Sequence, residues 1–326
     1  MIIVLLIGAG AGLVSALLFA VVVAASPLAL FLSFVAPLPV FIATLGWQHR
    51  AGLVAGAVGA VVIAFAFRWP AGVAFALGWA LPAWWLAYLA LLGRTGTNGV
   101  VEWYPIGRLL LWLAGTAAVV AMVGVVALGN GDYETFRTTM QRVFRGFWRA
   151  HPDAAVEVGA SDAFLDGIVA VLPFIVAASF TTILAANLWL SAKAVAISQR
   201  LARPWPFLPL TSMPRPALAL FAGASVLAFL PGFVGASGLA VLGALTVAFA
   251  LHGLALMHDV SRGRPARATL LTATYFVAFF LSQIGLPALA LTGMADAAFG
   301  LRRRFGGGAG PSPSPRHDIK RREPWK

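Results

Sequence analysis

The sequence has no cysteine and few acidic residues. Only 11 of its 326 residues are Asp or Glu. Without a thiol the chain has no disulfide, no thiolate metal site and no cysteine nucleophile, and the redox compartment stays undetermined. The sequence also lacks a HExxH motif, a phosphate-binding GxxxxGKS or GxxxxGKT motif and a carboxylate cluster typical of a metal site. We therefore expect no catalytic residue, no metal and no cofactor.

Long polar stretches are scarce as well, and apolar runs fill most of the chain. Hydrophobic residues make up 60% of the sequence, charged residues 10%, and the mean hydropathy is +0.89. Such a composition is typical of polytopic membrane proteins. Because one crossing needs about 20 apolar residues, the runs predict an all-α transmembrane helical bundle of eight or nine spans within residues 1–301. The expected spans are 2–25, 28–46, 54–67, 73–92, 109–128, 164–190, 217–256 (one span, or two around a Pro231-Gly232 break) and 268–300.

Basic residues gather toward the end of the chain. Half of the formal charge of +12 lies from residue 302 onward, where eight Lys or Arg accompany two acidic residues. Residues 302–326 are rich in Gly, Pro and Ser, a composition that predicts a disordered basic tail. The loop 193–215 has four Lys or Arg and no acidic residue. We expect both segments on the cytoplasmic face of a bacterial inner membrane, with their charge contacting lipid headgroups rather than nucleic acid.

The positions of this loop and of the tail conflict in a simple topology. Nine crossings in a row would place the two segments on opposite sides of the membrane, although both are basic. The conflict disappears if residues 268–300 fold back within the membrane at 285–287, or if residues 217–256 cross only once.

Residues 130–164 form the one substantial hydrophilic insert before the tail, and they predict an amphipathic helix. Apolar side chains at helical spacing share one face: Phe136, Met140, Val143, Phe144 and Phe147. Three arginines at 142, 145 and 149 lie on the other face. Such a helix lies on the bilayer surface or covers the mouth of the bundle.

Two short loops supply candidate ligand-binding residues. Trp47 and His49 follow a segment broken by prolines, which is typical of transporter binding loops and equally of an ordinary hairpin turn. Glu102, Tyr104 and Arg108 lie together before the span at 109–128. They either line a ligand mouth or serve as interfacial anchors with one salt bridge.

Two polar residues within predicted spans complete the candidate ligand site. Asn187 needs hydrogen-bond partners in lipid, so we expect it to face the bundle interior, either as a bridge between helices or as a ligand contact. His252 lies seven residues before Asp259 on one helix face. The two lie at opposite ends of two helical turns, which is a weak indication of a proton path.

Small residues recur at every fourth position of the first helix, at Gly8, Gly12, Ala16 and Ala20. This spacing lets a second helix approach closely. The row is either internal packing or a docking surface for a separate transmembrane subunit.

One serine motif suggests an enzyme. Gly235-Ala236-Ser237-Gly238 resembles the box around the nucleophile of rhomboid intramembrane proteases. The dyad needs a histidine on another helix, whereas His252 lies on the same helix, about 22 Å along its axis. We therefore keep an intramembrane serine protease as a remote alternative only.

Five motifs, taken in their order along the chain, resemble a family of uncharacterised bacterial membrane proteins, the YybS-like proteins. They are PLPVFIATLGWQHRAGLVAG (37–56), EWYPIGRLLLW (102–112), NLWLSAKAV (187–195), FALHGLALMHD (249–259) and GMADAAFGLRRR (293–304). That family is remotely similar to the substrate-capture (S) components of energy-coupling factor vitamin transporters. The resemblance implies a small-molecule ligand and a transmembrane coupling subunit that docks on the small-residue row of the first helix. This chain departs from S components in having more than their six spans and the 130–164 insert.

Two functions from different classes follow from these observations. The first is a non-enzymatic small-molecule binding and transport component, and the second is a membrane scaffold for a cell-envelope or division complex. A polar, closable cavity lined by several spans would favour the first, whereas a solidly packed bundle with an apolar outer groove would favour the second.

Overall fold

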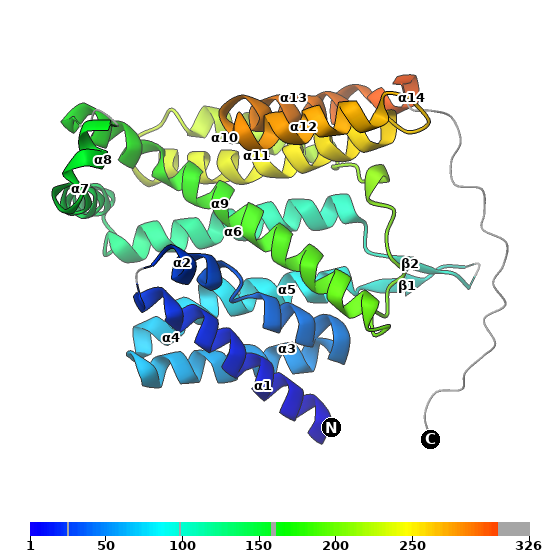
Figure 1. Cartoon of the computed structure of the whole chain (residues 1–326), viewed down its shortest axis with the longest axis horizontal. Coiled ribbons are helices and arrows are strands. Elements are labelled where there is room, and N and C mark those ends of the chain that lie inside the picture. Colours follow the sequence, from blue (N-terminus) through cyan, green and yellow to red (C-terminus); the bar gives the residue numbers. More distant parts are fainter. Residues whose placement is uncertain (25, 98, 158–160, 306–326) are drawn as a thin grey trace.

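The apolar runs of the sequence form helices that lie side by side in one bundle. The computed structural model describes residues 1–24, 26–97, 99–157 and 161–305 (Figure 1). The helices are α1 (Ile2–Ala20), α2 (Pro27–Phe34), α3 (Leu38–Ala66), α4 (Trp69–Phe75), α5 (Leu81–Ala90), α6 (Ile106–Leu128), α7 (Tyr133–Ala150), α8 (Pro152–Glu157), α9 (Asp162–Ile197), α10 (Pro216–Leu227), α11 (Gly232–Val260), α12 (Arg267–Phe280), α13 (Ser282–Phe299) and α14 (Leu301–Phe305). Short helical turns η1 (Val21–Ala24), η2 (Ala76–Ala80) and η3 (Leu208–Leu210) and a hairpin of β1 (Gly93–Thr95) and β2 (Val101–Trp103) complete the described elements.

The all-α transmembrane architecture is confirmed, but the count of eight or nine spans is not. Six helical stretches of the described residues are long and apolar enough to cross a membrane: Ile2–Ala24, Pro27–Ala66, Trp69–Ala90, Ile106–Leu128, Asp162–Ile197 and Gly232–Val260. The helices α10 and α12 have only 12 and 14 residues. At 1.5 Å per residue they extend about 18–21 Å, less than the roughly 30 Å of a hydrocarbon core.

The predicted turn after residue 46 lies inside α3. Trp47 and Gln48 have non-helical backbone angles, and Gln48 has a φ of 76°. The chain folds back at this point. The close approach of Gly52 to Thr44, eight residues earlier, shows this, since a Cβ on Gly52 would collide with the side-chain oxygen of Thr44. Only a residue without a side chain fits at position 52, so the hairpin depends on that glycine.

Helices α12 and α13 form a fold-back within 268–300, one of the two alternatives that would keep both basic segments on one side; the other also finds support, since in 217–256 only α11 is long enough to cross. The two helices of the fold-back are separated by Leu281 alone, and a Cβ on Gly285 would collide with the carbonyl oxygen of Val277. The reversal thus lies four residues before the expected 285–287 break. Arg302 of α14 donates hydrogen bonds to the carbonyl oxygens of Pro209 and Thr211. The basic loop and the start of the tail therefore lie at the same end of the bundle.

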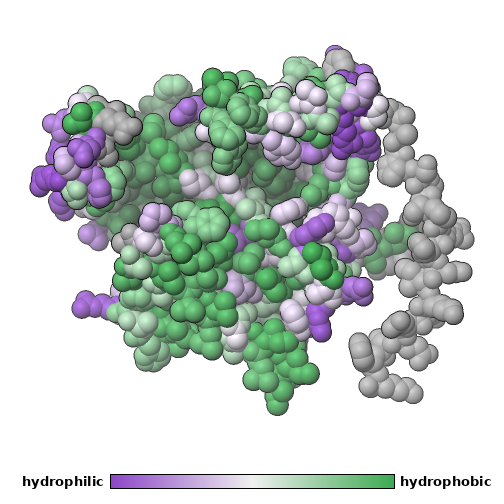
Figure 2. Space-filling model, viewed as in Figure 1, coloured by the Kyte–Doolittle hydropathy of each residue, from purple (hydrophilic) through white to green (hydrophobic). Residues whose placement is uncertain are grey.

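We call this end the basic end; it comprises the 47–50 turn, the β1–β2 hairpin, residues 198–215, residues 261–266 and α14. Helices α7 and α8 lie at the opposite end (Figure 1). Figure 2 shows hydrophobic residues over the sides of the bundle and hydrophilic residues gathered at both ends. The expected tail boundary at residue 302 falls within α14, and the expected disorder at 306–326 lies outside the described residues.

The predicted amphipathic helix is α7. The side chain of Asp132 caps its first turn by accepting a hydrogen bond from the amide of Thr135 at 2.7 Å, and this bond and that of the Thr135 hydroxyl hold the pKa of Asp132 below its ordinary value. Phe136 is buried, and Arg145 pairs with Asp162 of α9 at 2.8 Å. The helix is thus anchored to the bundle by its first turn and by an arginine from its polar face.

The small-residue row of α1 packs inside the molecule. A Cβ on Gly8 would lie 2.6 Å from the carbonyl oxygen of Ala51, and one on Gly12 would lie 2.5 Å from that of Ala55, both on α3. Ala16 is also buried, and Ala20 is half-buried. The internal-packing alternative accounts for the row, and docking of a separate subunit on these residues finds no support in this arrangement.

A break between α2 and α3 explains the polar residues buried near it. At this break the backbone N–H of Leu38 donates to the carbonyl oxygen of Val35, three residues earlier, and so does not pair with that of Phe34 as it would in a continuous helix. Asn187 donates to the carbonyl oxygen of Phe34 at 2.9 Å, and Ser191 donates to that of Leu38 at 3.3 Å. Asn187 therefore faces the interior, as predicted, and bridges α9 to the broken segment.

Replacing Asn187 with Leu is expected to lower the free energy of unfolding by about 0.6–2 kcal/mol. The substitution removes the bond to Phe34 and leaves that carbonyl oxygen without its donor inside the bundle. Thermal unfolding in detergent measures the change. Thr182→Leu is the control, because Thr182 lies on the same helix, is exposed and bonds only the carbonyl of its own turn. Equal melting temperatures for the two variants would contradict the assigned bridge.

Candidate functional site

A cavity of about 630 Å³ lies between α6, α9, α11 and the irregular segment 201–211. Its lining is mostly leucine, alanine and tryptophan side chains. The polar residues that line it are Thr182, Arg203, Thr211, His258 and Tyr275. The volume falls within the roughly 300–1,000 Å³ of small-molecule sites. The lining therefore suits a ligand with a large apolar part.

The cavity extends inward from the basic end along α9. Its lining residues on α9 run from Thr182 to Ala192, a rise of about 15 Å at 1.5 Å per residue. The depth matches one leaflet of a hydrocarbon core about 30 Å thick. Thr182, Ala186 and Trp189 line the cavity and are exposed. Because the three follow one another at helical spacing, the cavity is open along one face of α9.

One arginine lines this apolar space. Arg203 donates a hydrogen bond to the carbonyl oxygen of Ala90 at 3.2 Å. Burial lowers the pKa of its guanidinium, which stays protonated because its ordinary value is far above neutral. Among the described residues no carboxylate lies within ion-pair distance of it. Tyr275 and His258, joined at 2.8 Å, contribute further polar groups.

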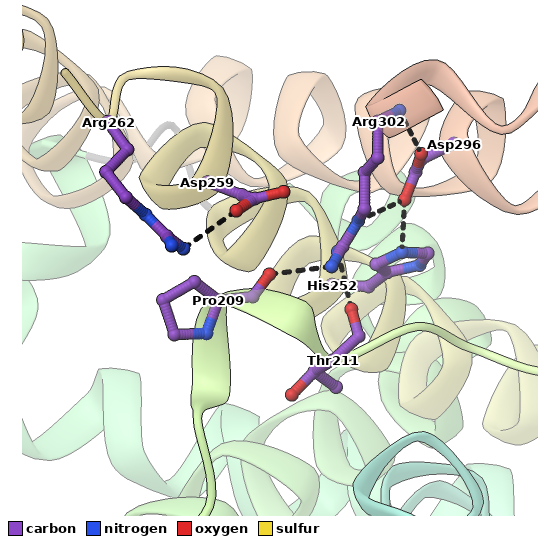
Figure 3. A network of polar contacts seen from close by, with 7 residues as sticks. All are labelled: Pro209, Thr211, His252, Asp259, Arg262, Asp296 and Arg302. Atoms are coloured by element: carbon purple, nitrogen blue, oxygen red, sulfur yellow. Dashed lines mark hydrogen bonds and ion pairs between the residues drawn. The ribbon is translucent and has the colours of Figure 1, made fainter. Parts of the chain in front are cut away.

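A buried charge network lies behind the cavity wall (Figure 3). Arg302 donates to Asp296 Oδ2 at 2.8 Å through its side chain, and its backbone N–H donates to Oδ1 at 3.1 Å. His252 Nε2 lies 2.9 Å from the same Oδ2. The His252 side chain is fully buried, and that of Asp296 is 4% exposed. Within the described part of the chain, His252 Nδ1 has no hydrogen-bond partner.

The same arginine holds the wall of the cavity in place. Arg302 also donates to the carbonyl oxygen of Pro209 at 2.6 Å and to that of Thr211 (Figure 3). Both residues line the cavity. Irregular backbone is tolerated at membrane depth only where its polar groups are satisfied within the protein. We call this set of bonds from Arg302 to Asp296, Pro209 and Thr211 the Arg302 clasp.

The two predicted binding loops lie at the basic end without lining the cavity. The guanidinium of Arg200 stacks over Trp47, 4.7 Å from the ring centre. The His49 ring meets Tyr88 edge-on, and the His49 carbonyl oxygen accepts a hydrogen bond from Trp84 at 3.1 Å. These contacts fix the turn in α3 against neighbouring helices.

In the second loop the salt bridge of Glu102 is formed with Arg94 and not with Arg108 of the predicted set. Glu102 pairs with Arg94 across the β1–β2 hairpin at 2.8 Å. Tyr104 accepts a hydrogen bond from Trp112 at 3.0 Å, and Arg108 is exposed. None of the predicted ligand residues lines the cavity; this holds for the three residues of this loop and also for Trp47, His49, Asn187 and His252.

The serine motif and the histidine serve separate packing roles. Gly235 lies against the turn at Leu230 and Gly238 against the end of α10, and a Cβ at either position would collide with backbone atoms. His252 contacts Asp296 of α13, and Asp259 pairs with Arg262 at 2.8 Å. Over the described residues no group of three or more His, Cys, Asp or Glu side chains gathers closely enough to hold a metal ion.

Sequence reasoning missed Arg203, Trp205, Asp296 and Arg302 as parts of one site. A local signal exists for the first two, because they lie in an Arg-Pro-Trp-Pro stretch. Paired prolines exclude a helix there and leave an arginine and a tryptophan on an irregular segment between two spans. No comparable signal marks the clasp, because its members lie far apart along the chain.

Comparison with known proteins places the chain in a family of membrane proteins. The model of a family described as "Predicted membrane protein (DUF2232)" matches residues 13–297. No curated protein and no solved structure matches the chain. The match covers every element that lines the cavity, together with most of α13.

Proposed function

We propose that this chain, which belongs to the predicted membrane protein family DUF2232, is a non-enzymatic membrane component that binds an amphiphilic small molecule between α6, α9 and α11. The observation that carries the proposal is the cavity of about 630 Å³, open along one face of α9. Its apolar lining differs from the polar cavity that a vitamin-type ligand needs. An amphiphile supplies both the apolar surface and the polar group that this lining accepts.

A transport role rests on the motifs that resemble YybS-like proteins and, remotely, S components. The buried row from Gly8 to Ala16 gives no support for docking a coupling subunit on α1. The cavity meets neither earlier criterion in full, since it is apolar rather than polar and the bundle around it is not solidly packed. Its volume of about 630 Å³ is what favours ligand binding over the scaffold. We therefore keep ligand binding as the leading function and transport as its extension.

The distribution of charge supports a cytoplasmic basic end in the inner membrane of a bacterium. Segments 198–215 and 261–266 and helix α14 carry arginines and no acidic residue, whereas at the opposite end the four arginines of α7 are accompanied by six acidic residues between 132 and 166. Short basic loops are retained on the cytoplasmic side. A cysteine introduced at Ser198 or at Ser314 is therefore expected to resist an impermeant maleimide in intact spheroplasts and to react after lysis. Labelling of either position from outside contradicts this orientation.

Binding is tested by filling the cavity. Ala185 lines it, so Ala185→Trp places a large ring in the ligand space. Ala194→Trp is the matched control, because Ala194 is exposed on the same helix and does not line the cavity. Native mass spectrometry of gently purified protein is expected to show a bound amphiphile in the unmodified chain and in Ala194→Trp, with most of it lost in Ala185→Trp. Equal retention in both variants would remove the cavity as the site.

A further inference from the structure

We infer that the ligand is a membrane lipid with an anionic phosphate headgroup, taken from the leaflet at the basic end, with its chain in the cavity and its phosphate at Arg203. The inference rests on the proposed function and names the ligand class for the same site. It stands on three observations: the depth of the cavity, its opening along α9 and one uncompensated cation.

The depth of the cavity matches one lipid chain in one leaflet. The lining on α9 extends about 15 Å, from Ala192 inward to Thr182, and Leu113 and Val247 line the cavity from α6 and α11. A water-soluble ligand would gain little from contact with an apolar lining about 15 Å long. A lipid chain fills it and replaces contacts that it makes with other lipids.

The opening of the cavity lies where a lipid can enter. Trp189 and Trp205 both line the cavity, and they are 48% and 40% exposed. Tryptophan favours the level of the headgroups. The ammonium group of Lys193 lies 4.6 Å from the centre of the Trp205 ring and places a second cation at this level. A headgroup therefore meets aromatic rings and positive charge at the basic end.

Charge selects an anion over a neutral headgroup. The described acidic residues of the basic end are already paired: Glu102 with Arg94, Asp259 with Arg262, and Asp296 with Arg302. Arg203 is left with the neutral carbonyl of Ala90. A half-buried guanidinium with free N–H groups binds a phosphate through paired hydrogen bonds, which are among the stronger polar contacts in proteins.

The experiment compares lipid retention from membranes of two compositions. The full-length protein is reconstituted in phosphatidylcholine nanodiscs with and without phosphatidylglycerol, and lipids that remain bound are identified by native mass spectrometry. The unmodified chain is expected to retain phosphatidylglycerol in preference to phosphatidylcholine. Arg203→Gln is expected to reduce this preference by about tenfold, while Arg203→Lys keeps the charge without the paired geometry and retains part of it.

Arg200→Gln is the matched control, since Arg200 stacks on Trp47 and does not line the cavity. It is expected to leave the lipid preference unchanged. Inorganic phosphate added to the nanodiscs is expected not to displace the lipid, because the chain contributes to binding; displacement would overturn the lipid assignment in favour of free phosphate. Melting temperatures of all variants are measured alongside.

The outcomes separate this inference from the proposed function. Equal retention of both lipids, reduced by Ala185→Trp and unaffected by Arg203→Gln, overturns the anionic class while the cavity remains a binding site. Retention that neither substitution changes overturns both. If Arg203→Gln does not fold, Arg203→Lys and Ala185→Trp still decide, because both must weaken retention of phosphatidylglycerol.

Discussion

Arg302→Ala is expected to lower the free energy of unfolding by about 3–5 kcal/mol, the range for removing one partner of a buried ion pair. The substitution leaves Asp296 charged and buried beside His252. It also removes the donors for two carbonyl oxygens of the cavity wall, at Pro209 and Thr211. Thermal and denaturant unfolding in detergent measure the loss.

Arg303→Ala is the matched control, because Arg303 is the next residue of α14 and is exposed. We expect it to change the melting temperature little. Arg302→Lys is expected to fall between the two, since a lysine keeps the charge and loses the geometry that reaches three partners. In the double variant with Asp296→Ala, the loss of stability is expected to be smaller than the sum of the losses in the two single variants. Additive losses, or an unchanged stability of Arg302→Ala, would remove the clasp as a structural element.

Gly12→Leu is expected to destabilise the isolated protein by at least the 1–3 kcal/mol typical of overpacking. Its first side-chain atom would lie 2.5 Å from the carbonyl oxygen of Ala55 and 3.0 Å from the Cβ of Val58. Helices α1 and α3 must separate to admit it. The melting temperature in detergent is expected to fall accordingly.

Gly10→Leu is the control on the same helix. A Cβ on Gly10 has no atom within 4 Å, so this variant changes hydrophobicity and helix propensity equally without entering the contact. We expect it to melt near the unmodified protein. A Gly12→Leu variant that keeps its melting temperature and loses a partner in cells would instead restore α1 as a docking surface.

Local patterns in the sequence predicted the elements that depend on a few neighbouring residues. The amphipathic α7, the turn at Trp47 and the break at Pro231 each follow from spacing or from a residue that interrupts a helix. The fold-back of α12 and α13 could be named only as one of two ways to keep both basic segments on one side. Charge decides which ends lie together, but not how deep a helix goes.

The site was predicted poorly because the prediction relied on polar residues within apolar runs, whereas the cavity is lined mostly by apolar residues. Leu113, Ala185 and Leu254 line the cavity, yet by type they are indistinguishable from residues in a solid core. Which of them borders a void depends on how helices distant in sequence approach each other. The pairing of His252 with Asp296 across 44 positions is hidden for the same reason.

The Arg302 clasp also couples the position of α14 to the wall of the cavity. Arg302 lies in α14 and is bonded to the cavity wall at Pro209 and Thr211, and the C-terminal segment follows directly after this helix. A partner that draws α14 away breaks those bonds and frees the wall, and a ligand that needs the wall in place opposes that partner. By thermodynamic reciprocity, each then weakens the binding of the other to the same extent. Binding of a ligand in the cavity would thus change the affinity of α14 for a partner at the basic end, and binding of that partner would change the affinity for the ligand.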